Sequence, residues 1–323
     1  MYVNIDVSVT IGDLVITNVI AIQIENSLNS LIDTATITLP REFRLNSNTD
    51  FRGKHLLDFI QKDMPVEIKL GYNEDLQTEF TGYITEIGAE IPTVIRCEDE
   101  MSKLKKSKKF NLNFESISLE DLLSEIAAGY TLACSQISLG KLSIQNATAY
   151  EVLEDLRKFG IKCWFVGKVL KAGTVLDLAE NNIHSYQFGK NIRESSDLKY
   201  VSKDKKDLKI KAISIQKGSS KKTIYEFGTN VNGERTLHAP LNLSSAELKE
   251  WAENYYKTIV FEGYEGNVDG WCIPRTKAGD LLELVDPNYP NQKRDGKFLI
   301  EEVGINVDES NGIKRSNKIS IKL

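Results

Sequence analysis

Three consecutive carboxylates, Glu98-Asp99-Glu100, are the residues whose type and spacing first suggest chemistry. Cleavage of a glycosidic bond needs two such groups at a fixed distance across the substrate. Three acids in a row at the end of a strand are more often a solvated loop, because charged side chains are seldom buried without partners. We therefore favour the solvated loop over a catalytic pair.

Other catalytic templates fail on spacing. The segment from Gly160 to Lys168 has too many residues between its glycines for a phosphate-binding loop, and Val169 replaces the hydroxyl residue that would bind magnesium. His55, His184 and His238 are isolated, so no two-histidine helical motif occurs, and there is no G-x-S-x-G elbow. The sequence predicts no catalytic, metal-binding or cofactor-binding residue, and we expect the protein not to be an enzyme.

Two clusters resemble binding surfaces. The lysines between 103 and 109 are clustered as in phosphate-binding segments, but Phe110 is the only nearby ring for stacking and the preceding acids partly cancel the field. We favour a solvated linker, which we take as a domain boundary. Trp251, Tyr255 and Tyr256 resemble a platform for a sugar or a base, yet their helical spacing favours packing in the core.

The four cysteines, Cys97, Cys134, Cys163 and Cys272, are far apart in the sequence and are embedded in apolar segments. This placement is typical of buried free thiols rather than of disulfides or a zinc site. We predict four buried free thiols.

Composition limits the classes of partner. The 323 residues are 41% hydrophobic and 27% charged, which is ordinary globular usage, and two or three packed units are expected at this length. The formal net charge of −5 provides no global attraction to nucleic acid or to an anionic membrane. The start of the chain lacks the order of a secretory signal, and no apolar run is long enough to span a bilayer. We therefore expect a protein made in the cytosol, with neither a specific nucleic-acid partner nor membrane insertion.

The first hundred residues carry strand signals. Ile20, Ile22 and Ile24 recur at period two, which places them on one face of a sheet, and 34–39 alternates in the same way until Pro40. A hairpin connection between these segments and a polar loop with room for a short helix from 41 to 62 are expected. Further strands are predicted at 66–70, 79–87 and 93–97, with a turn at Gly71-Tyr72-Asn73. Regular short strands of this kind favour a small antiparallel barrel or sandwich.

Helical periodicity begins after the lysine-rich linker. Ser118 and Asp121 predict one helix start, while the pairs Thr148–Glu151 and Ser244–Glu247 form capping boxes for two more. Gly160 is expected as a left-handed cap. Segments 161–166 and 175–178 are interpreted as paired strands, and 208–215 as a strand whose lysines face solvent. Strands return at 281–285, 297–305 and 318–321.

Three segments carry a resemblance to a known family. They are Val66 to Leu104 with the phrase Phe80-Thr81-Gly82-Tyr83-Ile84-Thr85, Thr148 to Leu170 with Phe159-Gly160 and Trp164, and Arg275 to Val303. In this order they resemble the central hub proteins of phage tails and baseplates, the late-control protein D family, and the hub part of type VI secretion spike proteins. Each pattern alone is degenerate, but together they cover most of the chain.

The resemblance implies an α+β, mostly β fold in which two small antiparallel β-barrels, similar to tail-tube domains, flank an α+β middle domain. The expected boundaries are 1–105 for the first barrel, 106–190 for the middle domain and 191–323 for the second barrel, with a helical insertion at about 236–260. The resemblance also implies a homotrimer that joins a hexameric tail tube to a threefold spike. This trimer would lie in the tail or baseplate of a virion or injection particle, which is assembled in the bacterial cytoplasm. Relatives in type VI systems continue into a β-helical spike, whereas this chain ends at Leu323, so a separate spike protein is expected.

Expected partners are the tail tube protein, that spike protein and other baseplate proteins, with a tape-measure protein as a further candidate. Arg41, Glu42 and Arg44 are candidates for the surface that faces the next ring, because their loop is polar and is tethered between strands. Two other functions remain open: a tail-associated peptidoglycan hydrolase, which needs two placed carboxylates or a zinc triad, and a carbohydrate-binding protein for receptor recognition.

Overall fold

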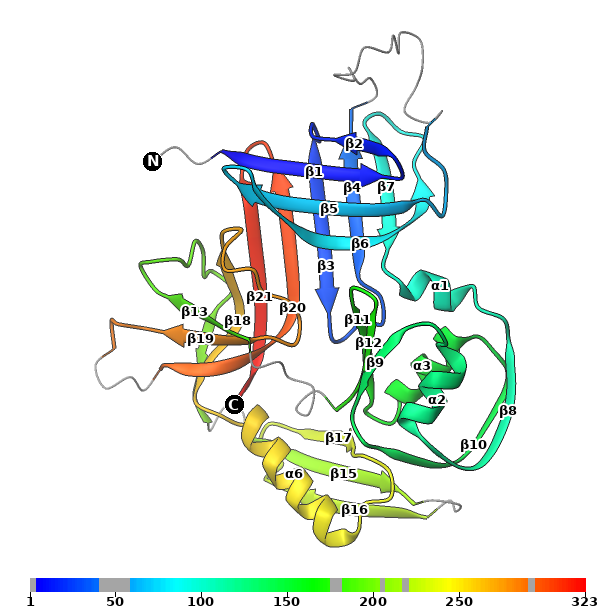
Figure 1. Ribbon diagram of the computed structural model, residues 1–323. Coiled ribbons are helices and arrows are strands. Elements are labelled where there is room, and N and C mark those ends of the chain that lie inside the picture. The colour runs from blue at the N-terminus through cyan, green and yellow to red at the C-terminus, as the bar shows by residue number, and fades with distance from the viewer. Residues whose placement is uncertain (1–3, 41–58, 175–181, 204–206, 217–220, 290–293) are drawn as a thin grey trace.

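The computed structural model describes residues 4–40, 59–174, 182–203, 207–216, 221–289 and 294–323 (Figure 1). Most of these residues lie in β-strands, and the helices gather in the middle of the chain and in one later segment. The predicted fold class, α+β and mostly β with antiparallel sheets, is confirmed.

The N-terminal segment forms seven strands, in the sheet order β3-β4-β7-β6-β5-β1-β2 with every neighbouring pair antiparallel. They are β1 (Ile5–Ile11), β2 (Leu14–Ile16), β3 (Ala21–Ser27), β4 (Thr34–Leu39), β5 (Pro65–Tyr72), β6 (Asp75–Ile87) and β7 (Thr93–Glu98). Alternation in β4 buries Ala35, Ile37 and Leu39 as predicted. Ile20 departs from the prediction, because it precedes β3 and is 45% exposed while Ile22 and Ile24 are buried.

A tight turn joins β5 to β6. Its two central residues, Asn73 and Glu74, have φ values of 52° and 71°. Two consecutive positive φ values are the signature of the turn that matches the twist of a hairpin. The turn that the sequence predicted at Gly71-Tyr72-Asn73 is thus present, with its centre shifted toward Glu74.

The middle segment combines helices with small sheets around a core of its own. Its elements are α1 (Met101–Lys105), β8 (Phe110–Ser118), α2 (Leu119–Ile126), β9 (Thr131–Cys134), β10 (Ser138–Ala147), α3 (Ala149–Arg157), β11 (Lys162–Val166) and β12 (Val169–Gly173). Ser118 accepts from the backbone of Asp121, and Thr148 forms a full capping box with Glu151, so both predicted helix starts are confirmed. Gly160 follows α3 with a φ of 78°, in the left-handed region expected of it.

The strand pairing in this segment differs from the expectation. β11 pairs antiparallel with β12, which begins only three residues later, and β12 pairs in parallel with β9. Val169 to Gly173 therefore takes the place predicted for 175–178, part of a segment that lies outside the described residues. Gly167 provides the reversal with a φ of 59°.

The C-terminal part contains a β-rich segment with an insertion. The β-rich segment consists of β13 (Ile183–Gln187), β14 (Lys199–Val201), β18 (Gly263–Gly270), β19 (Leu281–Val285), β20 (Gly296–Asp308) and β21 (Gly312–Lys322). The insertion is a sheet of β15 (Lys209–Ile215), β16 (Lys222–Phe227) and β17 (Glu234–His238), which helix α6 (Ser245–Ile259) contacts. Ser244 and Glu247 form the predicted capping box of α6. We refer to this sheet together with α6 as the insertion.

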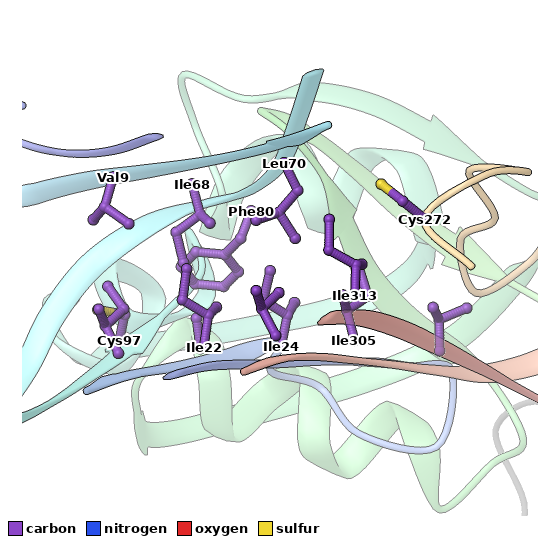
Figure 2. Packing of buried hydrophobic residues seen from close by; sticks show 14 of the residues in the cluster. Val9, Ile22, Ile24, Ile68, Leu70, Phe80, Cys97, Cys272, Ile305 and Ile313 are labelled. Atoms are coloured by element: carbon purple, nitrogen blue, oxygen red, sulfur yellow. The ribbon is translucent and has the colours of Figure 1, made fainter. Parts of the chain in front are cut away.

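One sheet connects the two β-rich ends of the chain. β20 pairs with β3 over seven residues, from Glu302 opposite Ser27 to Asp308 opposite Ala21. This pair joins the strands of the two ends into one sheet of 13 strands. In Figure 1 the long strands β20 and β21 run beside β3, while β1, β5 and β6 cross near their upper ends. Figure 2 shows the core between these layers, where Ile68 and Leu70 of β5 point toward Ile22 and Ile24 of β3.

Candidate functional site

The polar residues with the most unusual surroundings lie where the two β-rich ends meet, around the loop from Trp271 to Asp280. Arg315 of β21 is 0% exposed and donates from Nη2 to Glu79 Oε1 of β6 at 2.6 Å. Its Nη1 and Nε donate to the carbonyls of Thr276 and Cys272 at 2.8 and 3.3 Å. The Glu79 side chain is only 4% exposed, and the guanidinium of Arg275 lies 3.8 Å from the same oxygen. A buried ion pair therefore joins β6 to β21. The hydrogen bonds of Arg315 to Thr276 and Cys272 hold the loop from Trp271 to Asp280 against this pair.

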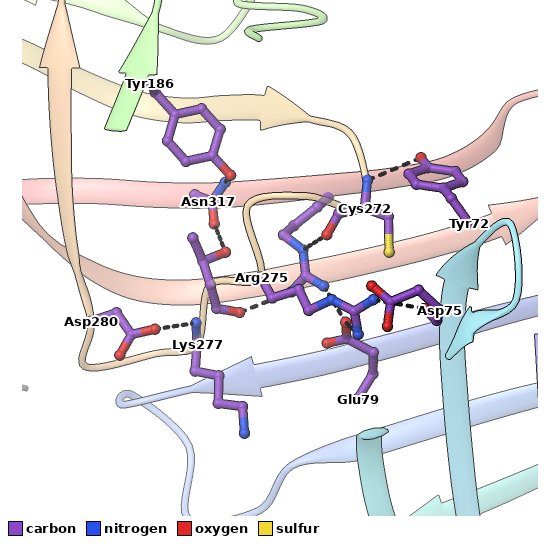
Figure 3. A network of polar contacts seen from close by, with 11 residues as sticks. Tyr72, Asp75, Glu79, Tyr186, Cys272, Arg275, Lys277, Asp280 and Asn317 are labelled. Carbon is purple, nitrogen blue, oxygen red and sulfur yellow. Dashed lines mark hydrogen bonds and ion pairs between the residues drawn. The ribbon is translucent and has the colours of Figure 1, made fainter. Parts of the chain in front are cut away.

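The network extends to other buried polar groups, as Figure 3 shows. Asn317 donates from Nδ2 to the hydroxyl of Tyr186 at 3.0 Å and accepts from the hydroxyl of Thr276. The backbone N–H of Cys272 donates to the hydroxyl of Tyr72 at 3.2 Å. The side chains of Asn317, Tyr186 and Thr276 partner one another, and Nη1 of Arg275 is the buried atom of this network without a hydrogen bond among the described residues. The network therefore fits a structural role that fixes one arrangement of the loop.

Two carboxylates, the buried Asp99 and the half-buried Asp33, lie close to this network. Asp33 accepts from the Asn26 side chain and from the backbone of Ser27, and its carbonyl accepts from the N–H of Asp99 at 3.1 Å. Asp99 Oδ1 accepts from Met101 N at 3.1 Å, whereas the buried Oδ2 atom has no partner among the described residues. Both side chains line a cavity of about 170 Å³, which β6, the loop between β11 and β12 and the 276–278 segment also border.

Burial is the main reason why these carboxyl groups titrate abnormally. It raises the pKa of Asp33 to about 7, although the hydrogen bonds from Asn26 and Ser27 and the charge of Lys277 act in the opposite direction. Burial, and then the negative charge of Asp33, raise the pKa of Asp99 well above its usual value, with a smaller contribution from Glu98. A carboxyl group whose pKa is higher in the folded state stabilises the fold at low pH and loses that contribution as the pH rises toward the folded pKa.

We expect the Asp99→Asn variant to be more stable than the parent protein at pH 8, by about 2 kcal/mol, because it removes one of two buried charges. Asp33 and Asp99 together should contribute a fall in the stability of the parent protein as the pH rises from about 4 to 7, and this contribution should be smaller in the variant. Urea denaturation at pH 5 and pH 8 measures both effects. Glu115→Gln, at an 89% exposed side chain, is the matched control and should leave the pH dependence unchanged. Equal destabilisation of Asp99→Asn at both pH values would contradict this account.

The interpretation of Glu98-Asp99-Glu100 as a solvated loop is wrong. Asp99 and Glu100 are 5% and 7% exposed, because the chain turns inward at the end of β7. Glu100 accepts from the hydroxyls of Tyr83 and Tyr130 at 2.7 and 2.9 Å, and Glu98 forms an ion pair with Lys105 at 2.8 Å. These acids have structural partners, and the unpaired Oδ2 of Asp99 is the exception.

The lysine-rich linker contains helix α1 and local contacts. Lys106 pairs with Asp63, and Lys103 lies 4.0 Å from the centre of the Tyr83 ring. The lysines of β15 pair across the sheet, with Lys209 Nζ 2.5 Å from a Glu226 carboxylate oxygen. These contacts occupy the lysines with neighbouring side chains of the same chain.

The remaining predicted residues divide into three groups. Trp251, Tyr255 and Tyr256 are half-buried and pack against a buried apolar cluster, as the packing interpretation expected, and Trp251 and Tyr255 also line a pocket. Cys97, Cys163 and Cys272 are buried free thiols, and burial raises the pKa of Cys97 and of Cys163 to about 12, but Cys134 is only half-buried. Arg41, Glu42 and Arg44, together with His55, lie outside the described residues.

The structure brings together one pair that the sequence left apart. His184 Nε2 lies 3.0 Å from Asp280 Oδ2, and Asp280 also accepts from the backbone N–H of Lys277 at 2.8 Å. Parallel pairing of β13 with β19 places this histidine beside the end of the 271–280 loop. Within the described ranges, no three His, Cys, Asp or Glu side chains form a group that could hold a metal ion. No helix in the described part of the chain is long and apolar enough to cross a membrane.

The comparisons with known proteins agree on the fold. No family model matches the sequence, and no curated relative matches it. A tail protein from Neisseria meningitidis MC58 has a similar structure, with a TM-score of 0.67 and 16% identity over 99% of this chain and 96% of that one. The 43 kDa tail protein of prophage MuSo2 from Shewanella oneidensis gives a TM-score of 0.65 and 14% identity, over 98% of both chains.

A third similar structure comes from a secretion system. It is an E. coli protein described as a component of the type VI secretion system, with structural similarity to the tail proteins gp27 and gp5 of bacteriophage T4. Its TM-score is 0.58 at 10% identity, over 99% of this chain and 77% of the other. The chain therefore has the fold of these tail proteins and of this type VI secretion component, as the resemblance in the sequence predicted.

Proposed function

We propose that this protein is the central hub of a tail or baseplate in a phage or a phage-like injection machine. Three copies would form an adaptor that joins the hexameric tail tube to a threefold spike. The observation that carries the proposal is the match of the whole chain, over 98% or more of its length, to two tail proteins, one of them from a prophage. A shared architecture that includes both β-rich ends and the middle segment supports a shared structural role more strongly than one common barrel would.

The edges of the large sheet support assembly into a ring. β2 and β14 are the terminal strands of the 13-stranded order, and β2 carries Val15, which is 54% exposed. The free backbone groups of an edge strand attract another strand unless something covers them. In a ring, every subunit makes the same contact with its neighbour, so one pair of complementary surfaces covers all the edges.

An apolar hollow beside β1 supports a contact between copies. Ile5 and Trp271 are 44% and 46% exposed, and they border a hollow of about 400 Å³ that Tyr72 and Ile313 also line. Ile273 lies two residues from Trp271 and is 50% exposed. Exposed apolar side chains in one place mark protein contacts, and we assign this hollow to the next copy of the chain.

The remaining partners follow from the same proposal. The polar residues Arg41, Glu42 and Arg44 would face the adjacent ring of the tail. The tail tube protein, a separate spike protein, other baseplate proteins and a tape-measure protein are the proposed partners, and the protein would act without enzymatic activity. The assembled particle would form in the bacterial cytoplasm.

We expect light scattering on the purified chain to give a mass of three times 36.4 kDa at micromolar concentration. The variant Trp271→Ser should shift the protein toward monomer because it removes the largest exposed apolar side chain of the hollow. Val231→Ser, at a 76% exposed position in the insertion, should leave the trimer intact. A persistent monomer at high concentration would count against the hub, and turnover of purified peptidoglycan by the chain would favour the hydrolase instead.

A further inference from the structure

A third pocket, of about 440 Å³, lies between the middle segment, the insertion and the β-rich segment, and Leu28 and Asn29 after β3 also line it. Its wall contains the end of α3, the start of β11, strand β17 and helix α6, and β20 and β21 contribute one residue each. Pockets of several hundred cubic ångströms at the meeting of separate units are where small ligands bind most often. No residue of this pocket takes part in the contacts described above for the hub.

Three cationic side chains converge on the pocket: Arg157 from α3, Lys162 from β11 and Arg235 from β17. Arg157 donates to the backbone carbonyl of Asn29, and Lys162 Nζ donates to Asn29 Oδ1 at 3.1 Å, so both acceptors are neutral. In the described part of the chain, none of the three cations forms an ion pair. The lining contains a single carboxylate, Glu301, which accepts from the hydroxyl of Ser320.

Burial and the gathering of positive charges both affect the pKa of Lys162. Burial lowers the pKa of this ammonium group, and the positive charges of Arg157 and Arg235 lower it further, while Glu301 offsets them in part. Like charges that gather in a partly desolvated pocket repel one another unless an anion joins them. An anionic group between the three cations would relieve this repulsion and would receive charge-assisted hydrogen bonds.

Aromatic side chains also line the pocket. Trp251 and Tyr255 of α6 stack on each other with ring centroids 5.3 Å apart and planes inclined by 18°. Phe159 and Leu237 add apolar surface. An apolar or planar molecule gains contact area on such a wall, which the hydrated simple ions of a buffer do not.

We propose that this pocket binds a small organic anion in which a carboxylate or phosphate group is attached to an apolar or aromatic body. The oxygens of the anion lie among Arg157, Lys162 and Arg235, and the body packs against Trp251 and Tyr255. Because the lining includes residues of the insertion and of the other segments, the bound molecule ties the insertion to the rest of the chain. This inference goes beyond the hub proposal and does not depend on it.

The test uses calorimetric titration of the full chain with five probes: benzoate, phenyl phosphate, acetate, inorganic phosphate and the cation benzamidine. We expect benzoate or phenyl phosphate to bind at least tenfold more tightly than acetate, inorganic phosphate or benzamidine, and the stronger of the two identifies the anionic group. Binding should raise the melting temperature and change the tryptophan emission, and the change in emission should be absent in Trp251→Phe. Added salt should weaken binding, because much of the attraction is between charges.

Matched variants localise the site. Lys162→Met and Arg235→Ala should each lower the affinity at least tenfold, and Arg235 lies on an exposed strand position, so its replacement should leave the fold intact. Lys158→Met removes the same charge four residues from Lys162, at a 70% exposed side chain outside the pocket, and should leave binding unchanged. The proposal is overturned if neither aromatic anion binds better than benzamidine, or if Lys158→Met and Lys162→Met have equal effects on binding.

Discussion

Replacing Arg315 with methionine is expected to lower the free energy of unfolding by about 3–5 kcal/mol, the usual cost of breaking a buried ion pair. Methionine fills much of the volume but leaves the carboxylate of Glu79, which is 4% exposed, without the guanidinium at 2.6 Å. The carbonyls of Thr276 and Cys272 also lose their donors. Urea denaturation at a fixed protein concentration measures the change, because assembly makes stability depend on concentration.

The double variant Arg315→Met with Glu79→Gln separates the charge from the packing. It should recover part of the loss, since the buried carboxylate that kept only the more distant Arg275, at 3.8 Å, is no longer present, but not the part that comes from the two carbonyls. The matched control is Lys318→Met on the same strand, where the pair with Glu302 is 3.0 Å long and about half exposed, and where we expect a change of about 0.5 kcal/mol or less. If Arg315→Met costs no more than Lys318→Met, the buried pair does not hold the two ends of the chain together.

The Gly82→Ala variant should also be strongly destabilised, by about 2–3 kcal/mol, because the added methyl group has no room. A Cβ at Gly82 would lie 2.2 Å from the carbonyl oxygen of Glu98 in β7 and 2.7 Å from the ring of Phe80. The backbone of β7 would have to move, and with it Asp99 and Glu100. The glycine in the phrase Phe80-Thr81-Gly82-Tyr83 is thereby explained as a position of close approach between two strands.

Gly304→Ala provides the comparison for this effect. Gly304 lies in β20, where a Cβ would meet no atom within 4 Å. Alanine restricts the unfolded chain more than glycine does, so this variant should be neutral or more stable by about 0.5 kcal/mol. Thermal unfolding of both variants at the same concentration makes the comparison, and similar melting temperatures would show that crowding at Gly82 is not the cause.

Local signals in the sequence were sufficient for the helices and most strands. The cap residues Ser118, Thr148 and Ser244 each accept from the backbone of the third residue after them, as the spacing predicted. A cap is a contact within one turn of chain, so its sequence signal does not depend on the rest of the fold. The alternation in β4 is similarly local, because one buried face fixes it.

The contacts that join distant parts of the chain had no comparable signal. The pairing of β20 with β3 links residues about 280 positions apart, and only hydrophobic pattern and register decide it. Asp99 is buried because the chain folds back at Asp33, which no local pattern shows. The network around Arg315 does have a signal in the sequence. Arg315 and Asn317 lie on the same face of β21 as Ile313 and Ile319. Two polar residues on an otherwise apolar strand face indicate that they have buried partners.

The measurement that tests the central claim most directly is a reconstruction of the native particle from electron images. We predict three copies of this chain in one ring on the tail axis, between the sixfold tube and the threefold spike, with the hollow at Ile5 and Trp271 covered by the next copy. A particle in which the layer between tube and spike is built by another protein, with this chain off the axis or absent, would contradict the assignment of the chain as the hub.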